Sequence, residues 1–148
     1  MNRDPIVTNE AVTQDRLDRE VRVPITTEID IVIARQRGRD LAAPLGFSSG
    51  DLALIATAIS EMARNIVQYA TRGEILLTLV EGKPRGIIVV ARDEGPGIPN
   101  LEFAMQDGYS TGGGLGLGLP GAKRLMDEFE VVSEPGKGTT VTMKKWKR

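Results

Sequence analysis

Residues 48–70 read SSGDLALIATAISEMARNIVQYA, and this stretch carries the clearest helical pattern in the chain. Ser48 and Asp51 have the spacing of a capping box, and Phe47 and Leu52 take the two positions of a hydrophobic staple around it. The apolar side chains that recur at helical spacing along one stripe are Leu52, Ile55, Ile59, Met62, Ile66 and Tyr69. The pattern predicts an amphipathic helix that packs this stripe against a core.

Shorter patterns on both sides of this helix predict the remaining elements. Residues 74–82, EILLTLVEG, and residues 85–93, RGIIVVARD, are typical of two strands joined by a tight Gly-Lys-Pro turn. The other predicted elements are a strand over 21–25, a helix over 28–43, a short helix near 100–106, a helix over 119–129, and strands over 130–134 and 139–146. Pro24 suggests that the first strand lies at an edge of the sheet. Thr27 and Asp30 have the spacing of a capping box at the start of the helix over 28–43.

The order of these elements, β-α-α-β-β-(α)-α-β-β, indicates the fold class. It predicts an α+β fold with a mixed β-sheet and helices packed on one face. Residues 1–20 are polar and lack a clear period, so we expect an N-terminal arm that is mobile or forms a short extra element. Residues 21–148 then form one domain, which suits a chain of 148 residues.

The composition excludes several kinds of chemistry. The chain has no His and no Cys, which removes Ser–His triads, phosphohistidine relays, thiol nucleophiles, disulfides and His- or Cys-based metal sites. A net charge of −1 gives no reason to expect a nucleic-acid or membrane partner. The longest strongly apolar run, Ile87–Ala91, is far too short to span a bilayer. Because the absence of Cys fits a reducing compartment, we expect a cytoplasmic location.

Glu61 and Asn65 are the first pair of residues with chemical potential. They lie four residues apart, so they project from neighbouring positions at the flank of the apolar stripe. Asn offers a neutral oxygen ligand that suits Mg²⁺, and Glu offers a base. Taken alone, this spacing is a weak pattern, and ordinary solvated polar residues are the simpler interpretation.

Asp93 ends a buried-looking strand and is followed closely by Gly95 and Gly97. An Asp in this position can accept a hydrogen bond from the exocyclic amine of a base. The glycines allow the backbone to approach a flat ligand closely. Thr139, which opens the last strand, could support Asp93 with its hydroxyl. A Gly-Pro turn after a strand, and an ordinary turn exit at Thr139, explain the same residues without a ligand.

Glycines are concentrated in one part of the chain, since nine of the 17 lie between Gly95 and Gly121. The densest run consists of Gly112, Gly113, Gly114, Leu115, Gly116, Leu117 and Gly118, and it leads into a predicted helix. Such a run frees backbone N–H groups for a phosphate, and the helix N-terminus adds partial positive charge. The run is neither a Walker A loop nor a Rossmann fingerprint. The leucines argue against the alternative of a solvated linker.

The order of these four motifs is far more specific than any one of them. The helical Glu-x-x-x-Asn, then Asp-x-Gly-x-Gly, then the glycine run, then Gly-Thr resembles the nucleotide site of the Bergerat-fold ATPases. This superfamily, also called GHKL, includes gyrase, Hsp90, MutL and the histidine kinases. The matching segments are residues 59–70, 91–100, 107–129 and 136–146. Within the superfamily, the chain is most similar to the small anti-sigma serine/threonine kinases that act as stressosome switches in bacterial stress responses.

This resemblance implies that the site binds ATP and Mg²⁺. Asn65 would ligate Mg²⁺ on the ATP phosphates, and Glu61 would orient or deprotonate the attacking hydroxyl. Some related kinases have an Arg just before the glycines of the phosphate loop, where this chain has Gly-Gly-Gly-Leu. Charge in the transition state would therefore be met by Mg²⁺, Arg64, Lys123 or a group of the partner. Solvated positions are an alternative for both side chains.

For the nucleotide base, the resemblance implies a second set of residues. Asp93 would bind the adenine amine, Gly95 and Gly97 would pack against the base, and Thr139 would support the adenine side. The run from Gly112 to Gly118 would close over the phosphates.

The resemblance also implies partners. The substrate would be a Ser or Thr of a STAS-domain scaffold protein, and the kinase, once released, would activate a PP2C-type phosphatase. A histidine-kinase mechanism within the chain is excluded because the chain has no His. Two alternatives stay open: a non-catalytic, ATP-gated protein-binding switch of the anti-sigma type, and an ATPase fragment of a larger machine.

Overall fold

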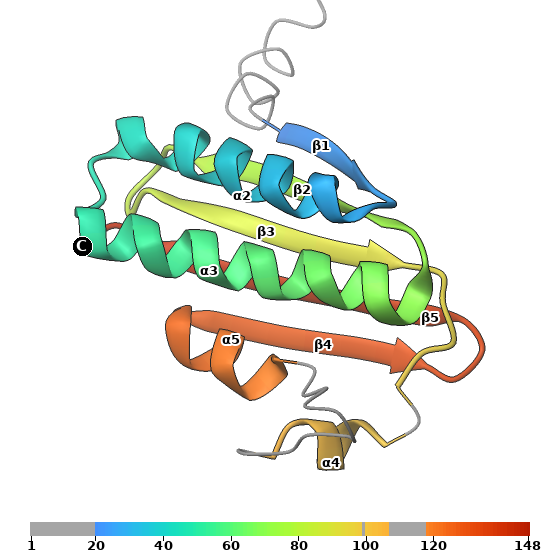
Figure 1. The fold of residues 1–148 in the computed structure, drawn as a ribbon. Helices are drawn as coiled ribbons and strands as arrows, with labels where there is room; N and C mark the ends of the chain where they lie inside the picture. Colours follow the sequence, from blue (N-terminus) through green and yellow to red (C-terminus); the bar gives the residue numbers. More distant parts are fainter. Residues whose placement is uncertain (1–19, 99, 107–117) are drawn as a thin grey trace, which may run out of the picture.

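The computed structural model describes residues 20–98, 100–106 and 118–148, which form five strands and their covering helices (Figure 1). The strands are β1 (Glu20–Ile25), β2 (Gly73–Val80), β3 (Gly86–Asp93), β4 (Glu128–Glu134) and β5 (Gly138–Trp146). The helices are α2 (Glu28–Ala42), α3 (Ser49–Asn65), α4 (Leu101–Ala104) and α5 (Leu119–Leu125). A 3₁₀ turn over Ala43–Leu45 follows α2, and a π-helical turn over Ile66–Ala70 continues α3.

The strands form one sheet in the order β1-β2-β3-β5-β4, and every pairing between the described strands is antiparallel. The expectation of a mixed sheet is therefore wrong, although the α+β class is confirmed. The chain leaves β3, passes through α4 and α5, and enters β4 in the direction of β3. β5 then turns back from β4 and occupies the position between them, so that each neighbouring pair is antiparallel.

Helices α2, α3 and α5 cover one face of the sheet, as expected (Figure 1). The apolar stripe of α3 packs against this face, and its members Ile55, Ile59 and Met62 are at most 1% exposed. In β2, Ile75, Leu77 and Leu79 alternate with half-buried residues and point toward the helices. Burying each such side chain contributes about 1.5–3 kcal/mol to the free energy of unfolding, which makes this layer the main source of stability.

The helix starts follow the predicted caps. The carboxylate of Asp30 accepts hydrogen bonds from the backbone N–H groups of Thr26 and Thr27, at 2.8 and 3.0 Å. The hydroxyl of Ser48 accepts one from the N–H of Asp51 at 3.0 Å. Ser48 thereby pairs a donor in the first turn of α3, and Asp30 pairs two donors of the residues that precede α2. Among the described residues, no helix has the length and apolar character needed to cross a membrane.

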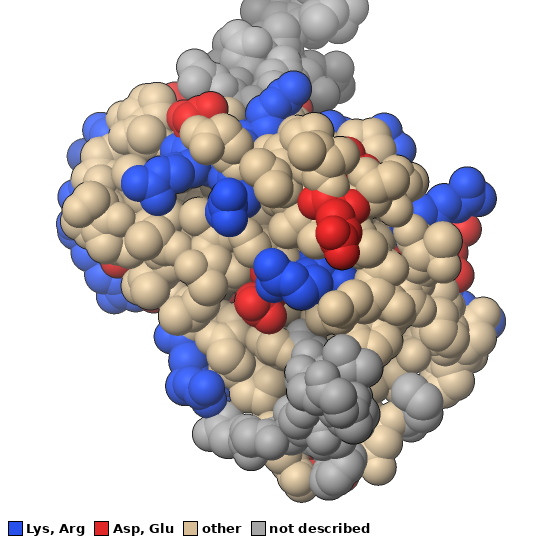
Figure 2. Space-filling view, in the orientation of Figure 1, with Lys and Arg blue, Asp and Glu red and all other residues tan. Residues whose placement is uncertain are grey.

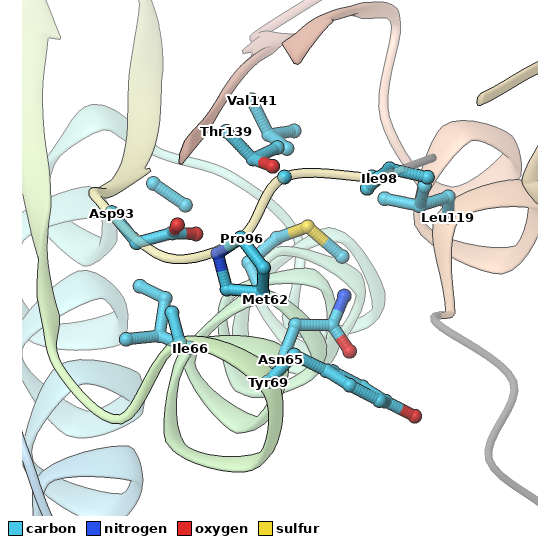
Figure 3. A pocket seen from close by; sticks show the side chains of 13 residues that line it. Met62, Asn65, Ile66, Tyr69, Asp93, Pro96, Ile98, Leu119, Thr139 and Val141 are labelled. Atoms are coloured by element: carbon cyan, nitrogen blue, oxygen red, sulfur yellow. The ribbon is translucent and has the colours of Figure 1, made fainter. Parts of the chain in front are cut away.

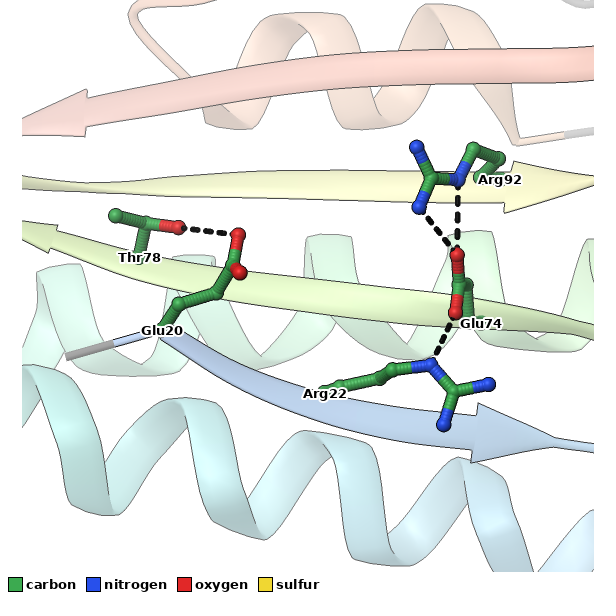
Figure 4. A network of polar contacts seen from close by, with 5 residues as sticks. All are labelled: Glu20, Arg22, Glu74, Thr78 and Arg92. Atoms are coloured by element: carbon green, nitrogen blue, oxygen red, sulfur yellow. Dashed lines mark hydrogen bonds and ion pairs between the residues drawn. The ribbon is translucent and has the colours of Figure 1, made fainter. Parts of the chain in front are cut away.

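A polar network ties the edge strand β1 to its neighbours on the open face of the sheet (Figure 4). The carboxylate of Glu74 on β2 accepts hydrogen bonds from Arg22 on β1 and from Arg92 on β3, the latter Nε at 2.8 Å. These two guanidinium groups hold the pKa of Glu74 below its usual value. The network bridges three adjacent strands, so it supports the register in which Glu74 lies opposite Arg92.

The last helix is shorter than the sequence predicts. The helix expected over 119–129 ends at Leu125, because Met126 adopts an extended backbone with φ −110° and ψ 163°. Strand β4 then begins at Glu128 instead of residue 130, and Phe129 pairs with Met143 of β5. The alternation of polar and apolar residues in EFEVV satisfies a strand better than a helix that would continue away from the sheet. Residues 1–19 lie outside the described residues, so the N-terminal arm stays an expectation.

Candidate functional site

A pocket lies where the end of α3, the end of β3 and the start of β5 meet (Figure 3). Its lining residues are Met62, Asn65, Ile66, Tyr69, Ala70, Ala91, Asp93, Pro96, Gly97, Ile98, Leu119, Thr139 and Val141. Most of them are apolar, and the four polar side chains come from three segments of the chain. The cavity has a volume of about 50 Å³. Clefts that bind drug-sized ligands measure about 300–1,000 Å³, so a larger ligand would extend beyond this cavity.

The polar side chains of the pocket face it from different sides (Figure 3). Asp93 and Thr139 come from the facing ends of β3 and β5, where they are register partners. Asn65 and Tyr69 come from the last turns of the α3 segment. Asn65, Asp93, Gly97 and Thr139, four of the residues that the motifs single out, therefore line a single cavity.

Asp93 is the acidic group of this cavity. Burial raises the pKa of its carboxyl group, while hydrogen bonds from the backbone N–H groups of Gly95 and Thr139 act in the opposite direction. Its Oδ1 accepts the N–H of Gly95 at 2.8 Å. Gly95 does not line the cavity itself, and its part in the site is to hold this carboxylate. A half-buried carboxylate in a mostly apolar pocket favours a ligand that donates a hydrogen bond.

The loop that carries Gly97 is held in place by the β4–β5 hairpin. The backbone N–H of Gly136 donates to the carbonyl oxygen of Pro96 at 2.7 Å. Gly97 has φ +79°, and a Cβ atom at this position would lie 2.4 Å from the carbonyl oxygen of Glu134. Because both the backbone conformation and the space exclude a larger residue, glycine is required where the hairpin and the loop touch.

Ser133 belongs to the site, and the motifs do not identify it. Its hydroxyl accepts the backbone N–H of Ile98 at 2.7 Å and shares a hydrogen bond with the hydroxyl of Thr139 at 2.9 Å. It thereby joins the loop after β3 to the start of β5. The sequence contains a sign of this role, because the alternation of β4 places Ser133 on the same side as Phe129 and Val131. A polar residue on the core-facing side of a strand needs a partner nearby.

Glu61 lies one helical turn before Asn65 and does not line the cavity. A Cβ atom built on Gly118 would lie 2.5 Å from Oε1 of Glu61, so the glycine allows the carboxylate to approach the start of α5. The other oxygen, Oε2, accepts a hydrogen bond from Nη1 of Arg64 at 3.0 Å. The structure therefore brings Glu61 together with Gly118, at the end of the glycine run.

Two candidate cations lie apart from the pocket. Arg64 is 45% exposed in its side chain and pairs with Glu61. Lys123 lies in the last turn of α5, is exposed, and does not line the cavity. The predicted phosphate-binding residues Gly112, Gly113, Gly114, Leu115, Gly116 and Leu117 lie outside the described residues.

The pocket fits a metal ion only if the ion arrives with a bound molecule that supplies further coordinating atoms. No group of three or more acidic side chains that could hold a metal by itself occurs in the described parts of the chain. The amide of Asn65 faces the pocket as a single neutral ligand (Figure 3). A Mg²⁺ ion usually keeps several waters and takes few protein ligands when it binds with phosphates. The residues present fit that mode.

Comparisons with known proteins identify the family to which the chain belongs. Residues 50–148 match the family described as histidine kinase-, DNA gyrase B-, and HSP90-like ATPase. The chain is 54% identical over 127 residues to the serine/threonine-protein kinase RsbT of Bacillus subtilis (strain 168), which covers 85% of this chain and 96% of RsbT. It is 36% identical over 110 residues to an anti-sigma F factor of Thermoanaerobacter sp. (strain X514), which covers 71% of this chain and 77% of that factor.

Among solved structures, the chain resembles the SiaB–SiaC complex from Pseudomonas aeruginosa with a TM-score of 0.59 and 14% identity. The match covers 99% of both chains, and at this identity it concerns the fold alone. The family match spans the whole site described above, from α3 to β5. The chain therefore belongs to the histidine kinase-, DNA gyrase B- and HSP90-like ATPases, and within this family it is a serine/threonine-protein kinase of the RsbT and anti-sigma type.

Proposed function

We propose that this kinase binds Mg²⁺-ATP in the pocket at the end of α3. It would transfer the γ-phosphate to a Ser or Thr of a STAS-domain scaffold protein. The observation that carries the site assignment is that Asn65, Asp93, Gly97 and Thr139 line one cavity. These residues come from three separate segments of the chain, so their convergence supports a common ligand. The identity of the protein substrate rests on the motif resemblance and on the similarity to RsbT.

The adenine would occupy the end of the pocket that holds Asp93. Its carboxylate accepts a hydrogen bond from the exocyclic amine, and apolar side chains such as Ile98 and Val141 pack against the ring. Thr139 supports this end through its hydroxyl, which Ser133 orients. A base without an amine at that position would leave the carboxylate of Asp93 without a hydrogen-bond donor, which costs binding free energy. The contact therefore favours adenine over such bases.

The phosphates would extend toward Asn65 and the start of α5. Asn65 offers its amide oxygen as a ligand for Mg²⁺, which neutralises phosphate charge when bound. The glycine run that ends at Gly118 supplies backbone N–H groups to the phosphates in this proposal. Phosphoryl transfer depends mainly on positioning and on charge stabilisation, so no covalent enzyme intermediate is required.

Glu61 would act on the attacking hydroxyl. Its carboxylate accepts a hydrogen bond from that hydroxyl and takes the proton as the new oxygen–phosphorus bond forms. Arg64 holds the other carboxylate oxygen at 3.0 Å and so orients Glu61. The proximity of Glu61 to Gly118 supports this role, because the base must lie beside the phosphates.

The biological role follows from the partners that we propose. The kinase binds the unphosphorylated scaffold, leaves it after phosphorylation, and is then free to activate a PP2C-type phosphatase in bacterial stress signalling. ATP as the phosphate donor agrees with the expected cytoplasmic location.

Two substitutions test the site separately from the fold. Asn65→Ala is expected to abolish Mg²⁺-dependent ATP binding. Glu61→Gln is expected to leave ATP binding within about twofold and to lower phosphate transfer by about 10²-fold or more, the usual contribution of a general base. Glu130→Gln is a matched control, because Glu130 is exposed on β4 and does not line the pocket.

The measurements are nucleotide binding by calorimetry and transfer of labelled phosphate to a purified STAS-domain protein. A Glu61→Gln variant with the wild-type rate would contradict the assignment of the base. If the scaffold is bound in an ATP-dependent manner but never labelled, the chain is a non-catalytic ATP-gated switch. The absence of an Arg before the glycine run favours this second candidate.

A further inference from the structure

A row of three polar residues crosses the sheet at the end of the pocket that holds Asp93. Asp93 on β3 pairs in register with Thr139 on β5, and Thr139 pairs in turn with Ser133 on β4. Asp93 and Thr139 line the cavity, whereas Ser133 lies behind Thr139 and is not part of the lining. The row therefore ends in a half-buried hydroxyl group that stands outside the pocket.

The hydroxyl group of Ser133 joins two lining residues that belong to separate segments. Its oxygen accepts the backbone N–H of Ile98 at 2.7 Å and lies 2.9 Å from the hydroxyl oxygen of Thr139. The carbonyl oxygen of Gly138, at 3.4 Å, is a second and more distant acceptor. Because a hydroxyl group has one proton and two lone pairs, Ser133 can satisfy the Ile98 N–H and still donate to β5.

Backbone contacts hold the same loop against the β4–β5 hairpin. The N–H of Gly136 donates to the carbonyl oxygen of Pro96 at 2.7 Å, and Gly97 packs closely against the carbonyl group of Glu134. In the described part of the chain, Ser133 provides the side-chain hydrogen bond between this loop and the hairpin. A single side-chain substitution can therefore loosen the loop while the backbone contacts remain.

Loss of this hydroxyl group would leave the N–H of Ile98 without its acceptor. Because Ile98 and Ser133 are half-buried, an unsatisfied donor there is unfavourable, and the loop would shift until water or another group pairs with it. Pro96 and Ile98 line the cavity, so the shift would displace the wall against which a planar base packs. Asn65 and Glu61 belong to α3 and would keep their positions.

Charged side chains of both signs occur on the described part of the face drawn in Figure 2. Lys and Arg are interspersed with Asp and Glu there. Attraction of an anionic ligand from a distance requires a field of one sign. With mixed charges, the affinity for a nucleotide depends more on contacts inside the pocket, including the position of the wall that packs against the base.

We propose that Ser133 is a positioning residue for the adenine base. Through Ile98 and Thr139 it fixes the loop after β3 against the start of β5, and it thereby sets the affinity of the pocket for an adenine nucleotide. It acts without touching the nucleotide. This inference rests on the proposed function, because it takes the base to bind beside Asp93. It adds a contribution from β4, a strand whose residues do not line the cavity.

The test compares Ser133→Val with Ser133→Thr, because the two new side chains have the same shape and differ by the hydroxyl group. Steady-state transfer from labelled ATP to a purified STAS-domain protein gives KM and kcat, and inorganic tripolyphosphate serves as a competing ligand without a base. We expect Ser133→Val to raise the KM for ATP about tenfold. Both kcat and the inhibition constant of tripolyphosphate should stay within about twofold of wild type, and Ser133→Thr should restore the KM.

Two further variants separate loss of the hydroxyl group from a change of side-chain volume. Ser133→Ala removes the hydroxyl group without adding a methyl group, and it should raise the KM for ATP as Ser133→Val does. Thr142→Val is the matched control: Thr142 lies on β5, alternates with the buried Val141 and Met143, and does not line the pocket. Its KM for ATP should equal that of wild type.

The proposal is overturned if folded Ser133→Val and Ser133→Ala keep the wild-type KM for ATP. It is also overturned if they weaken tripolyphosphate as much as ATP, because Ser133 would then support the whole site and not the base. The proposed function can fail separately. If wild-type protein binds ATP but transfers no phosphate to the STAS-domain protein, the proposed phosphoacceptor is wrong, and calorimetric affinities of the same variants for ATP still decide the role of Ser133.

Discussion

Asp93 is unfavourable for the stability of the fold, and we propose that it is needed for ligand binding. Burial raises the pKa of its carboxyl group, so the ionised form that is present at neutral pH costs stability in the folded protein. The N–H of Gly95 offsets part of this cost. A fold that keeps such a group in an apolar pocket has it positioned for a ligand that donates a hydrogen bond.

Asp93→Asn is therefore expected to separate binding from stability. The amide oxygen can still accept the N–H of Gly95, but the amide NH₂ would then oppose the amine of adenine. We expect ATP affinity to fall about 10- to 100-fold, since a hydrogen bond to a charged group contributes about 1.5–3 kcal/mol. The melting temperature at neutral pH should be unchanged or higher. Calorimetric titration and thermal unfolding measure the two effects, with exposed Glu94→Gln as the matched control.

The pH dependence of these effects has a definite sign. Because the folded-state pKa of Asp93 lies above the unfolded value, its stabilising contribution is present at low pH and lost as pH rises through the folded pKa. ATP affinity should change in the opposite direction and decline as the carboxyl group becomes protonated. An Asp93→Asn protein that binds ATP as tightly as wild type would contradict the assigned role.

At the residue scale, the sequence singled out several residues that line the pocket, and their functional roles stay predictions. Asn65, Asp93 and Thr139 could be found because they stand at fixed places in motifs, and the structure brings them to one cavity. Ser133 and Tyr69 were missed as site residues. Their contribution depends on which segments approach each other in space, such as the 2.7 Å contact between Ser133 and the N–H of Ile98.

The end of α3 is the element that departs most from the prediction. The apolar stripe predicted one continuous helix to Tyr69, but the α-helix ends at Asn65 and continues as a π-helical turn over Ile66–Ala70. Thr71 then takes φ +74°, which is rare for a residue with a branched side chain. Four pocket residues come from this region: Asn65, Ile66, Tyr69 and Ala70. The irregular backbone thus carries the side chains that line the pocket and that we propose to contact the nucleotide.

Thr71→Gly is expected to stabilise the protein. Glycine adopts positive φ without the steric cost that a side chain imposes, so the free energy of unfolding should rise by about 1 kcal/mol. The same substitution in a regular helix should lower the free energy of unfolding. Thr57→Gly, at an exposed position in α3, should lower the free energy of unfolding by a few tenths of a kcal/mol.

Chemical denaturation of both variants measures these changes. If Thr71→Gly destabilises the protein as Thr57→Gly does, the positive φ at Thr71 does not cost energy. The outcome does not depend on any assumption about catalysis, so it tests the geometry of this element alone.

The remaining elements were predicted wherever the sequence period was clear. Alternation marked β2 and β3, and capping residues marked the starts of α2 and α3. The boundary between α5 and β4 was placed too late, because a short segment such as residues 126–129 fits helix and strand patterns equally well. Pairing of Phe129 with Met143 decides it, and that contact is visible only in the folded chain.

At the scale of the whole molecule, the sheet topology accounts for the site. The order of elements correctly indicated an α+β fold with helices on one face, but not that β5 inserts between β3 and β4. This insertion places Thr139 opposite Asp93 and brings the β4–β5 turn against the loop at Pro96. The strand order follows from long-range pairing, which local patterns do not specify.

The pocket with Asn65 and Asp93 lies where the end of α3, the end of β3 and the start of β5 meet. The chain has no His of its own to phosphorylate, in agreement with a phosphoacceptor on a partner.

The most direct test of this account is the intact mass of a STAS-domain protein after incubation with the kinase, ATP and Mg²⁺. The account predicts the addition of one phosphoryl group at a Ser or Thr of that protein. The addition should be lost with Asn65→Ala and strongly reduced with Glu61→Gln. An unmodified STAS-domain protein that nevertheless binds the ATP-loaded chain would contradict the central claim that this pocket performs phosphate transfer to a partner.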